Sequence, residues 1–263
     1  MGDFDRVLAA RSADRPTGLQ FFSGIFSEFM ELHGDRRYGD DPAIVGGIGR
    51  LNGLAVTAIC TEKGRSTRDK VRRNFGSAHP EGYRKALRLM KQAEKFGRPV
   101  ICFVDTSGAF CGMEAEERGE GQAIAENLME MMTLQVPILT VISGEGGSGG
   151  ALALAVANQV WMMENGAYSV ISPEGCASIL WKDAARKEDA ADHLGLTAQK
   201  LLELGIVDRV IQEDEPMDAV MRRLRDDLYD AVTALQKLDA KELTQARYDR
   251  FRRIGADRIR NEE

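Results

Sequence analysis

Short, continuously apolar segments alternate with helix-forming segments through the middle of the chain, and this alternation limits the possible folds more than any other feature. These segments occupy residues 100–104, 138–142 and 159–163, and Thr140 and Gln159 are the only polar residues in them. Strands that lack polar alternation and are separated by helices are typical of parallel sheets buried on both faces. The sequence therefore predicts an α/β protein with a buried, largely parallel sheet.

The segments around this alternation predict a hairpin and further helices. Residues 43–50 and 54–61 are expected to pair as a β-hairpin, because Asn52-Gly53 favours a type I′ turn. Pro80 is expected to open a helix after a polar, irregular stretch at residues 64–78. Other helices are expected at residues 19–33, 115–134, 149–157, 184–193 and 198–204 and from residues 173 and 217 onward, with brief strands at 168–171 and 206–211.

Nothing in the sequence marks a domain boundary. The 263 residues suffice for one large domain with a full core, and no Pro- or Ser-rich linker or repeat divides them. We expect a single domain over residues 1–263, with its core at about residues 15–215 and a C-terminal helix and charged tail at 216–263. Residues beyond 238 are mostly charged, which favours a frayed or partner-bound end.

The composition gives no sign of membranes, disulfides or metals. No apolar run approaches the ~20 residues of a membrane span, and the N-terminus has no apolar export signal, so a cytoplasmic protein is expected. Four scattered cysteines form no C-x-x-C pair, so reduced thiols and no metal in this chain are expected. Residues 62–98 carry twelve Lys and Arg against four Asp and Glu, which suits a phosphorylated ligand, an acidic partner or a solvated helix face.

A glycine-rich turn is the strongest chemical signal. Five glycines fall within residues 144–150, at the end of one predicted strand, and a second glycine turn at residues 105–112 ends the preceding one. Ligands of open α/β folds lie beyond such strand ends. The expected helix 149–157 has no polar face, so its start should be buried, where unpaired N–H groups stabilise a developing negative charge strongly. We therefore expect Gly149 and Gly150 to form a backbone oxyanion hole.

The same turn fits the G-x-S-x-G pattern of serine hydrolases, with Ser148 as the nucleophile. A serine nucleophile needs a histidine base, and the sequence has only His33, His79 and His193, none in a context typical of a general base. A ClpP-like serine peptidase is the alternative function. A Ser148→Ala exchange would separate the two, because a backbone oxyanion hole needs no hydroxyl. A non-catalytic scaffold for a homologous partner is a third hypothesis.

Several stretches of the sequence, in order, resemble the α subunit of bacterial acetyl-CoA carboxylase carboxyltransferase. The resemblance covers about residues 15–215. It implies a crotonase (ClpP)-like fold, a spiral of ββα units, which agrees with the hairpin and alternating layers expected above. The stretches that carry it are residues 34–51, 72–76, 80–90, 115–119, 144–153 and 169–182.

The resemblance also implies a reaction and partners. The implied reaction moves a carboxyl group from carboxybiotin, held on a biotin carboxyl carrier protein, to acetyl-CoA, giving malonyl-CoA in the first committed step of fatty acid synthesis. The implied partners are a zinc-ribbon-bearing β subunit in an α2β2 assembly, the carrier protein and biotin carboxylase. The family's zinc belongs to the β subunit, so no metal is expected in this chain.

The resemblance places further residues at the site. Gly149 and Gly150 would hold either the biotin or the enolate oxyanion, and the sequence leaves both open. In the superfamily the loop after the early strand donates another N–H group, which points to Gly64 and its neighbours. A Gly150→Val exchange is expected to fill the ligand's space and abolish turnover. The substrate-binding residues expected beside the oxyanion hole are Gly147, Ala151, Gly108, Ala109, Gly64, Arg65 and Ser66.

Two departures from the family pattern stand out. In the turn at residues 105–112, Ser107, Phe110 and Cys111 replace the usual Pro, Tyr and Pro, and the loss of two prolines should loosen the turn. The match begins near residue 15, without the long N-terminal helical extension of many members.

Overall fold

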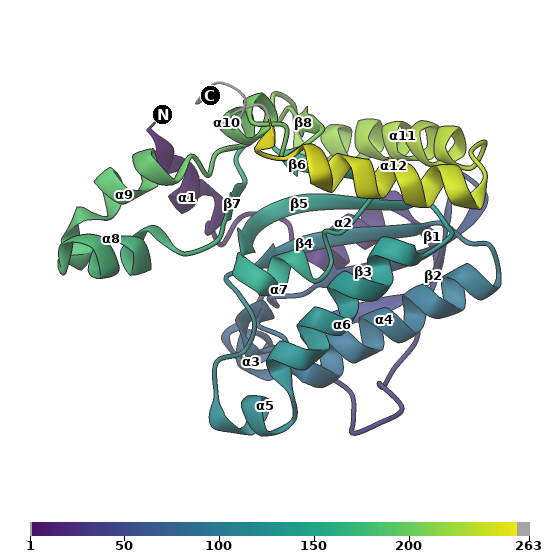
Figure 1. Cartoon of the computed structure of the whole chain (residues 1–263), viewed down its shortest axis with the longest axis horizontal. Coiled ribbons are helices and arrows are strands. Elements are labelled where there is room, and N and C mark those ends of the chain that lie inside the picture. The colour runs from purple at the N-terminus through teal and green to yellow at the C-terminus, as the bar shows by residue number, and fades with distance from the viewer. Residues whose placement is uncertain (1, 257–263) are drawn as a thin grey trace.

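Strands β1 to β8 form one sheet in the structure, a computed structural model that describes residues 2–256 (Figure 1). The order is β1-β2-β3-β4-β5-β6-β8, and β7 pairs with the end of β5. Strands β1 to β3 are antiparallel, and the pairings from β3 onward are parallel, so the predicted, largely parallel sheet is confirmed. The bounds are β1 Ser27–Glu31, β2 Ile44–Leu51, β3 Leu54–Thr61, β4 Val100–Thr106, β5 Ile138–Gly147, β6 Gln159–Met163, β7 Ala167–Ser169 and β8 Arg209–Ile211.

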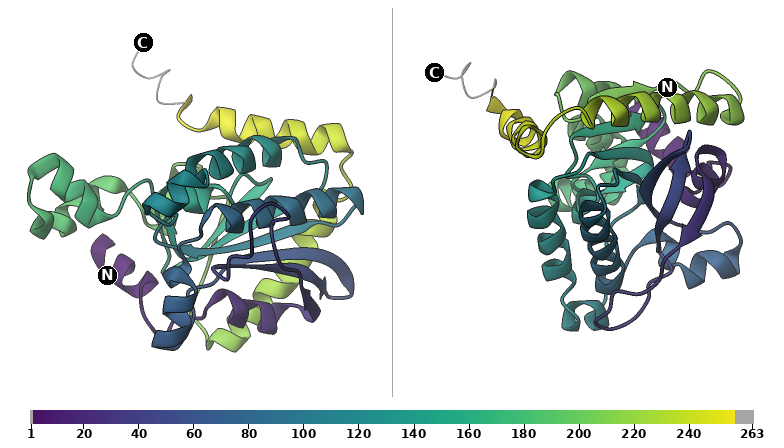
Figure 2. Two further views of the ribbon diagram at one scale, coloured as in Figure 1. Left: turned by 90° about the horizontal axis from the view of Figure 1, so that it is seen from below. Right: turned by 90° about the vertical axis from the view of Figure 1, so that its right-hand side faces the viewer.

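Helices cover both faces of the sheet (Figures 1 and 2). Along β4, Cys102 and Val104 join the buried cluster beneath α4 and α6, whereas Ile101 and Phe103 join the cluster beneath α2 and α11. Burial on both faces explains why the strand is continuously apolar. None of the helices within residues 2–256 is long and apolar enough to cross a membrane. The helices are α1 Asp3–Ala10, α2 Gly18–Ile25, α3 Thr67–Arg72, α4 Pro80–Lys95, α5 Met113–Glu117, α6 Glu120–Thr133, α7 Ser148–Leu152, α8 Pro173–Trp181, α9 Lys187–Leu194, α10 Ala198–Glu203, α11 Met217–Leu235 and α12 Ala240–Arg253, with 3-10 turns at Asn74–Gly76 and Ala184–Arg186.

The N-terminal part of the fold is only partly as predicted. The β2–β3 hairpin turns at Asn52-Gly53, both with positive φ, as expected. The single helix expected at residues 19–33 is wrong, because α2 ends at Ile25 and the chain continues as β1, antiparallel to β2. A glycine permits this pairing, since a Cβ atom at Gly47 would collide with the backbone carbonyl of Met30.

Three other predicted elements differ in the middle of the chain. The helix expected at residues 115–134 is broken at Gly119, whose φ of +83° separates α5 from α6. The helix expected at residues 149–157 ends at Leu152, and the buried chain that follows it is not helical. Helix α3 occupies part of the stretch expected to be irregular. Pro80 opens α4 as predicted.

The charged C-terminal segment is a packed helix, α12, and not the frayed tail that its composition suggested. Arg247 is fully buried and donates hydrogen bonds to the carbonyls of Met131 (2.6 Å) and Leu134 (2.8 Å) at the end of α6. Arg250 pairs with Asp208 at 2.9 Å. Backbone carbonyls, the side-chain oxygen of Asn158 and one carboxylate accept hydrogen bonds from these guanidinium groups, so the charged sequence still packs, although Nε of Arg247 has no partner among the described residues. The part of the expected tail beyond residue 256 lies outside the described residues.

Helices α1, α8 and α9 form an arm beside the carboxyl end of β5 (Figure 1). Phe4 and Val7 of α1 are buried with Ala167, Ala191 and Leu196 in a separate small cluster. The N-terminal helix is therefore an integral part of the arm, although well over a hundred residues separate it in sequence from α8 and α9.

Candidate active site at two glycine turns

The two glycine turns pack directly against each other where β4 and β5 end. A Cβ atom at Gly147 would collide with the carbonyl of Ser107. A Cβ atom at Gly150 would lie 2.5 Å from the amide nitrogen of Ala109 and 2.7 Å from the hydroxyl oxygen of Tyr83. Only glycine permits such close approach. The structure therefore brings Gly147 and Gly150 together with the turn that contains Gly108 and Ala109, as the sequence predicts.

The amides at the start of α7 are available to a ligand. Within residues 2–256, the N–H groups of Gly149 and Gly150 donate to no other backbone or side-chain group. Gly149 lies at the wall of a pocket of about 370 Å³, and Gly150 and Ala151 are buried behind it. Unpaired donors beside an apolar pocket suit a ligand oxygen that gains negative charge. The pocket is lined by Ser148, Gly149, Leu152, Tyr168, Ser169, Val170, Leu194, Leu201 and Ile206.

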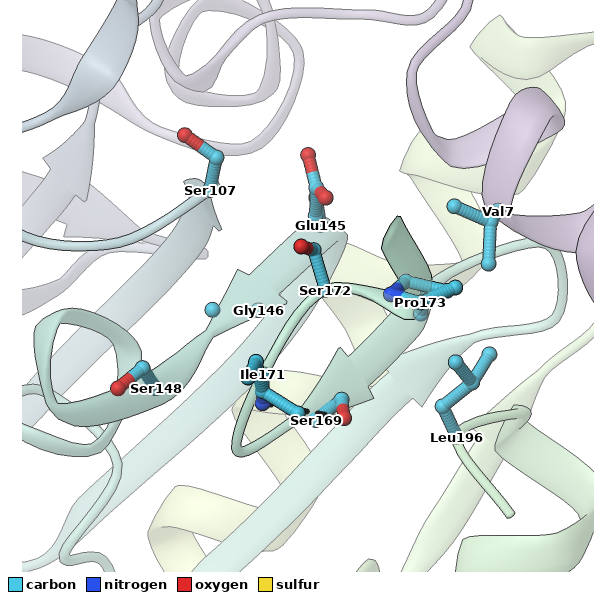
Figure 3. Close-up of a pocket in the computed structure, with 12 residues that line it drawn as sticks. Val7, Ser107, Glu145, Gly146, Ser148, Ser169, Ile171, Ser172, Pro173 and Leu196 are labelled. Atoms are coloured by element: carbon cyan, nitrogen blue, oxygen red, sulfur yellow. Dashed lines mark hydrogen bonds between the residues drawn. The ribbon is translucent and has the colours of Figure 1, made fainter. Parts of the chain in front are cut away.

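A second, much smaller cavity of about 30 Å³ lies on the arm side of the same turn (Figure 3). Ser148 lies at one side of it, and Val7 and Leu196 lie on the opposite side. Because a cavity of this size holds only one or two water molecules, we do not assign it to the substrate.

Ser148 has the backbone of a nucleophile elbow but lacks a base. It is exposed and has a φ of +52°, a conformation that favours glycine. No histidine of the described chain hydrogen-bonds to it. His33 contacts Asp40 (3.0 Å), and His79 contacts Asn74 (2.9 Å). The third, His193, contacts the carbonyl of Asp189 (2.7 Å). The serine–histidine pair that a peptidase needs is absent from residues 2–256.

In the loop after β3, the N–H group of Gly64 already has a partner within the chain. The N–H group of Gly64 donates to the Glu62 carboxylate at 2.7 Å, and the Ser66 hydroxyl accepts the N–H of Asp69 at 3.1 Å as the cap of α3. None of Gly64, Arg65 and Ser66 lines the pocket beside Gly149.

The turn at residues 105–112 is held by contacts that replace the missing prolines. Thr106 Oγ1 accepts the N–H of Gly108 at 3.1 Å, and Phe110 donates its N–H to the carbonyl of Ala78 at 2.9 Å. The Phe110 ring stacks on His79 with 4.0 Å between centroids. The loosening expected from the sequence is therefore countered by local hydrogen bonds and stacking.

The structure also shows a row of charged side chains that the sequence analysis missed. We call Lys63, Asp105, Glu145, Arg11 and Glu174 the strand-end ion network. Lys63 pairs with Asp105 at 2.6 Å, and Asp105 accepts the N–H of Glu145 at 2.8 Å. Arg11 joins Glu145 to Glu174, each at 2.8 Å. Sequence spacing gives no signal for these contacts, because they join segments far apart in the chain.

A buried polar cluster lies behind the glycine turns. The hydroxyl of Tyr83 and both carboxylate oxygens of Glu120 are buried and have no hydrogen-bond partner among the described residues. Burial raises the pKa of Glu120 to about 8, and three acids add to the shift against an opposing contribution from Arg118. Burial also raises the pKa of Tyr83. Glu120 is therefore largely protonated at neutral pH. The three acids are Asp41, Glu116 and Glu81.

Much of the basic segment at residues 62–98 serves the fold. Lys85 is buried and pairs with Asp40 at 2.6 Å, and Arg84 pairs with Asp35 at 2.8 Å.

No cluster of three or more potential metal ligands occurs within residues 2–256. The four cysteines are free.

The chain resembles known proteins along nearly its whole length. The family described as acetyl co-enzyme A carboxylase carboxyltransferase-like matches residues 1–255. A protein of Ruminiclostridium cellulolyticum named acetyl-coenzyme A carboxylase carboxyl transferase subunit alpha is 56% identical over 97% of this chain and 98% of its own. One of the same name from Streptococcus thermophilus is 56% identical over 96% of this chain and 100% of its own.

Solved structures show the same fold at low sequence identity. A chain from a Pseudomonas malonate decarboxylase hetero-tetramer, solved in complex with coenzyme A, superposes with a TM-score of 0.70 at 18% identity, over 93% of this chain and 97% of that one. Transcarboxylase 12S gives a TM-score of 0.68 at 19% identity, over 86% of this chain and 42% of that one. The expected crotonase-like fold is confirmed, and the peptidase alternative is not favoured. This chain therefore belongs to the family of acetyl-CoA carboxylase carboxyltransferase alpha subunits.

Proposed function

We propose that the main-chain N–H groups of Gly149 and Gly150 hold one of the two oxyanions formed when a carboxyl group passes from carboxybiotin to acetyl-CoA. The observation that carries this proposal is the unpaired amide of Gly149 at the wall of the 370 Å³ pocket, with the unpaired amide of Gly150 buried directly behind it. In this assignment Gly147, Ala151, Gly108 and Ala109 surround the substrate.

The chemistry asks little of side chains. Carboxybiotin supplies the carboxyl group, and charge then gathers on a urea or thioester oxygen. A backbone donor aimed at such an oxygen contributes about 3–4 kcal/mol to the transition state. Because Gly150 and Ala151 are buried, water screens the donors weakly and their dipoles act at close to full strength. The shortage of catalytic side chains at the site agrees with this assignment.

As an alpha subunit of a carboxyltransferase, the chain works in a multisubunit assembly with a beta subunit. We infer an α2β2 assembly in the cytoplasm, in which the zinc-ribbon-bearing beta subunit supplies the second oxyanion hole. Carboxybiotin arrives on a biotin carboxyl carrier protein after biotin carboxylase has loaded it. The pocket beside Gly149 opens to the surface, which suits a ligand carried on another protein.

The sharpest test removes one N–H group. Gly149→Pro deletes the donor, and proline is tolerated in the first helical turn. Gly149→Ala is the matched control, because its Cβ would meet only Ile124, at 3.5 Å, and its N–H remains. With the beta subunit present, we expect Gly149→Pro to slow carboxyl transfer between malonyl-CoA and biocytin by about 100-fold. Gly149→Ala should stay close to wild type.

Folding is checked separately, by thermal midpoint and by co-elution with the beta subunit. If Gly149→Pro fails to fold, replacement of Gly149 by its α-hydroxy acid removes the same N–H with almost no change in shape. A folded variant without the N–H that turns over at the wild-type rate would refute the oxyanion assignment.

A further inference from the structure

Arg11 occupies a central place in the strand-end ion network. It directly follows α1, and one guanidinium contacts two carboxylates at once. Nε and Nη2 donate to Glu145 at 3.0 and 2.8 Å, and Nη1 donates to Glu174 at 2.8 Å. These contacts raise the pKa of Arg11 although burial acts to lower it, and they lower the pKa of Glu174 although burial acts to raise it. The three side chains are partly buried, so water screens them less than it screens surface pairs.

The first carboxylate belongs to the strand that leads into the oxyanion helix. Glu145 lies in β5, three residues before Ser148. Its N–H is already fixed to Asp105 at 2.8 Å, and Asp105 is held by Lys63. This close approach depends on a glycine, because a Cβ atom at Gly144 would collide with the Asp105 carboxylate. Arg11 therefore contacts a part of β5 that the hydrogen bond to Asp105 already holds in place.

The second carboxylate lies just beyond the chain segment that forms another wall of the pocket. Glu174 is in the first turn of α8, which begins at Pro173, directly after the segment at residues 170–172. That segment is held at its start by the pairing of Gly147 with Ser169. Val170, which lines the pocket beside Gly149, is 76% exposed. Arg11 holds the other end of the segment, through Glu174.

Ile171 packs against the small buried cluster of α8 and α9, but the side of this segment that faces α1 is incompletely packed. The 30 Å³ cavity separates Ile171, Ser172 and Pro173 from α1 and from the end of β5 (Figure 3). Helix α1 itself is anchored independently, because Phe4 and Val7 are buried in the arm. The guanidinium of Arg11 thus bridges the gap left by the cavity, and the helix that precedes Arg11 is itself firmly packed.

We propose that Arg11 is a positioning residue that sets the gap between the amides of α7 and the pocket wall that Ser169 and Val170 form. This inference rests on the proposed function, since it assigns the pocket to the carboxyl-transfer reaction. Arg11 touches no reacting atom. It acts through Glu145 and Glu174, and its loss widens the pocket without removing a donor.

The test compares Arg11→Gln with Arg6→Gln in the assembled enzyme. Arg6 lies on α1, which Arg11 follows, and it donates to the carbonyl of Glu164 (2.9 Å), away from the pocket. We expect Arg11→Gln to raise the KM for biocytin about tenfold, because the widened pocket holds the ligand less well, with a smaller change in kcat. Arg6→Gln should leave the KM unchanged. Arg11→Lys should recover part of the loss, because one ammonium group can hold one carboxylate but not both.

A double-variant cycle tests whether Arg11 acts on the pocket wall through Glu174. Because Arg11 acts on the wall through Glu174, adding Glu174→Gln to Arg11→Gln should cause little further loss. Hydrogen exchange at residues 170–172 should quicken in Arg11→Gln while the thermal midpoint stays near that of Arg6→Gln. A lowered midpoint with an unchanged KM would overturn the proposal, since Arg11 would then only stabilise the fold. This failure is distinct from failure of the oxyanion assignment, which the Gly149 variants decide regardless of Arg11.

Discussion

Replacing Arg247 by methionine gives the clearest test of how the C-terminal helix is held. The guanidinium is 0% exposed and donates to Met131, Leu134 and Val136 carbonyls at 2.6, 2.8 and 3.0 Å. It also donates to the side-chain oxygen of Asn158 at 2.7 Å. No carboxylate hydrogen-bonds to it within the described chain, and burial lowers its pKa to about 10.

The magnitude follows from two opposing effects. Arg247→Met leaves three buried carbonyls without a donor, each costing about 1–3 kcal/mol. The variant also avoids the cost of burying a charge, and this effect raises the free energy of unfolding by several kcal/mol. We expect a net loss of about 3 kcal/mol in the free energy of unfolding, because the three carbonyls lie at or just after the end of α6, where no intrahelical N–H group reaches them. For a chain of this size that corresponds to a fall of about 6–12 °C in the thermal midpoint.

The assay is thermal and urea unfolding of the variant beside Arg252→Met. Arg252 lies on the same helix and is exposed, so its replacement should change the stability by about 0.5 kcal/mol or less. If Arg247→Met unfolds at the same temperature as Arg252→Met, or at a higher one, the carbonyls do not depend on Arg247 and the reasoning is wrong.

The remaining predictions concern the site. Because the pKa of Glu120 is raised from 4.5 to about 8, its stabilising contribution is full below pH 4.5 and is lost as the pH rises towards 8, with a slope of up to about 1.4 kcal/mol per pH unit. Glu120→Gln should flatten this decline in urea unfolding, and an unchanged slope would contradict the assignment. Ser148→Ala should keep most of the transferase rate, whereas a nucleophilic role predicts a loss of about 10⁴-fold or more. Gly150→Ala should lower both stability and turnover, because its Cβ would lie 2.5 Å from Ala109; normal unfolding and turnover would show that the two turns are not tightly packed.

The last prediction differs from the one made from sequence, in which a side chain at Gly150 fills the ligand's space. In the structure that side chain points at Ala109 and Tyr83, and Gly150 does not line the 370 Å³ pocket. Loss of activity would therefore come from displacement of the turn at residues 105–112. A sequence reveals that a glycine is needed but not which neighbour requires it.

Local signals predicted most of the parallel sheet. Continuously apolar runs located β4, β5 and β6, and Asn52-Gly53 located the hairpin. Both signals depend on neighbouring residues alone. The glycine turns could likewise be placed at strand ends, and the structure brings them together there.

Features that depend on distant contacts could not be predicted. Phe29 and Met30 continue the helical spacing of the apolar residues before them, yet residues 27–31 form a strand. Gly47 permits this, because a glycine without a Cβ atom leaves room for the Met30 backbone beside it. The charged segment after residue 238 reads as solvent-exposed, yet Arg247 is buried among carbonyls contributed by another helix. The strand-end ion network joins five segments that are far apart in sequence.

The unpaired amides of Gly149 and Gly150 have a consequence for inhibition. A compound that binds these N–H groups contacts atoms common to every amino acid, so no single exchange of a side chain deletes its anchor except proline, which would also damage the enzyme. Escape would have to arise in the surrounding walls, at positions such as Val170 or Leu194. Substitutions that confer drug resistance should therefore occur in the pocket walls and leave Gly149 and Gly150 unchanged.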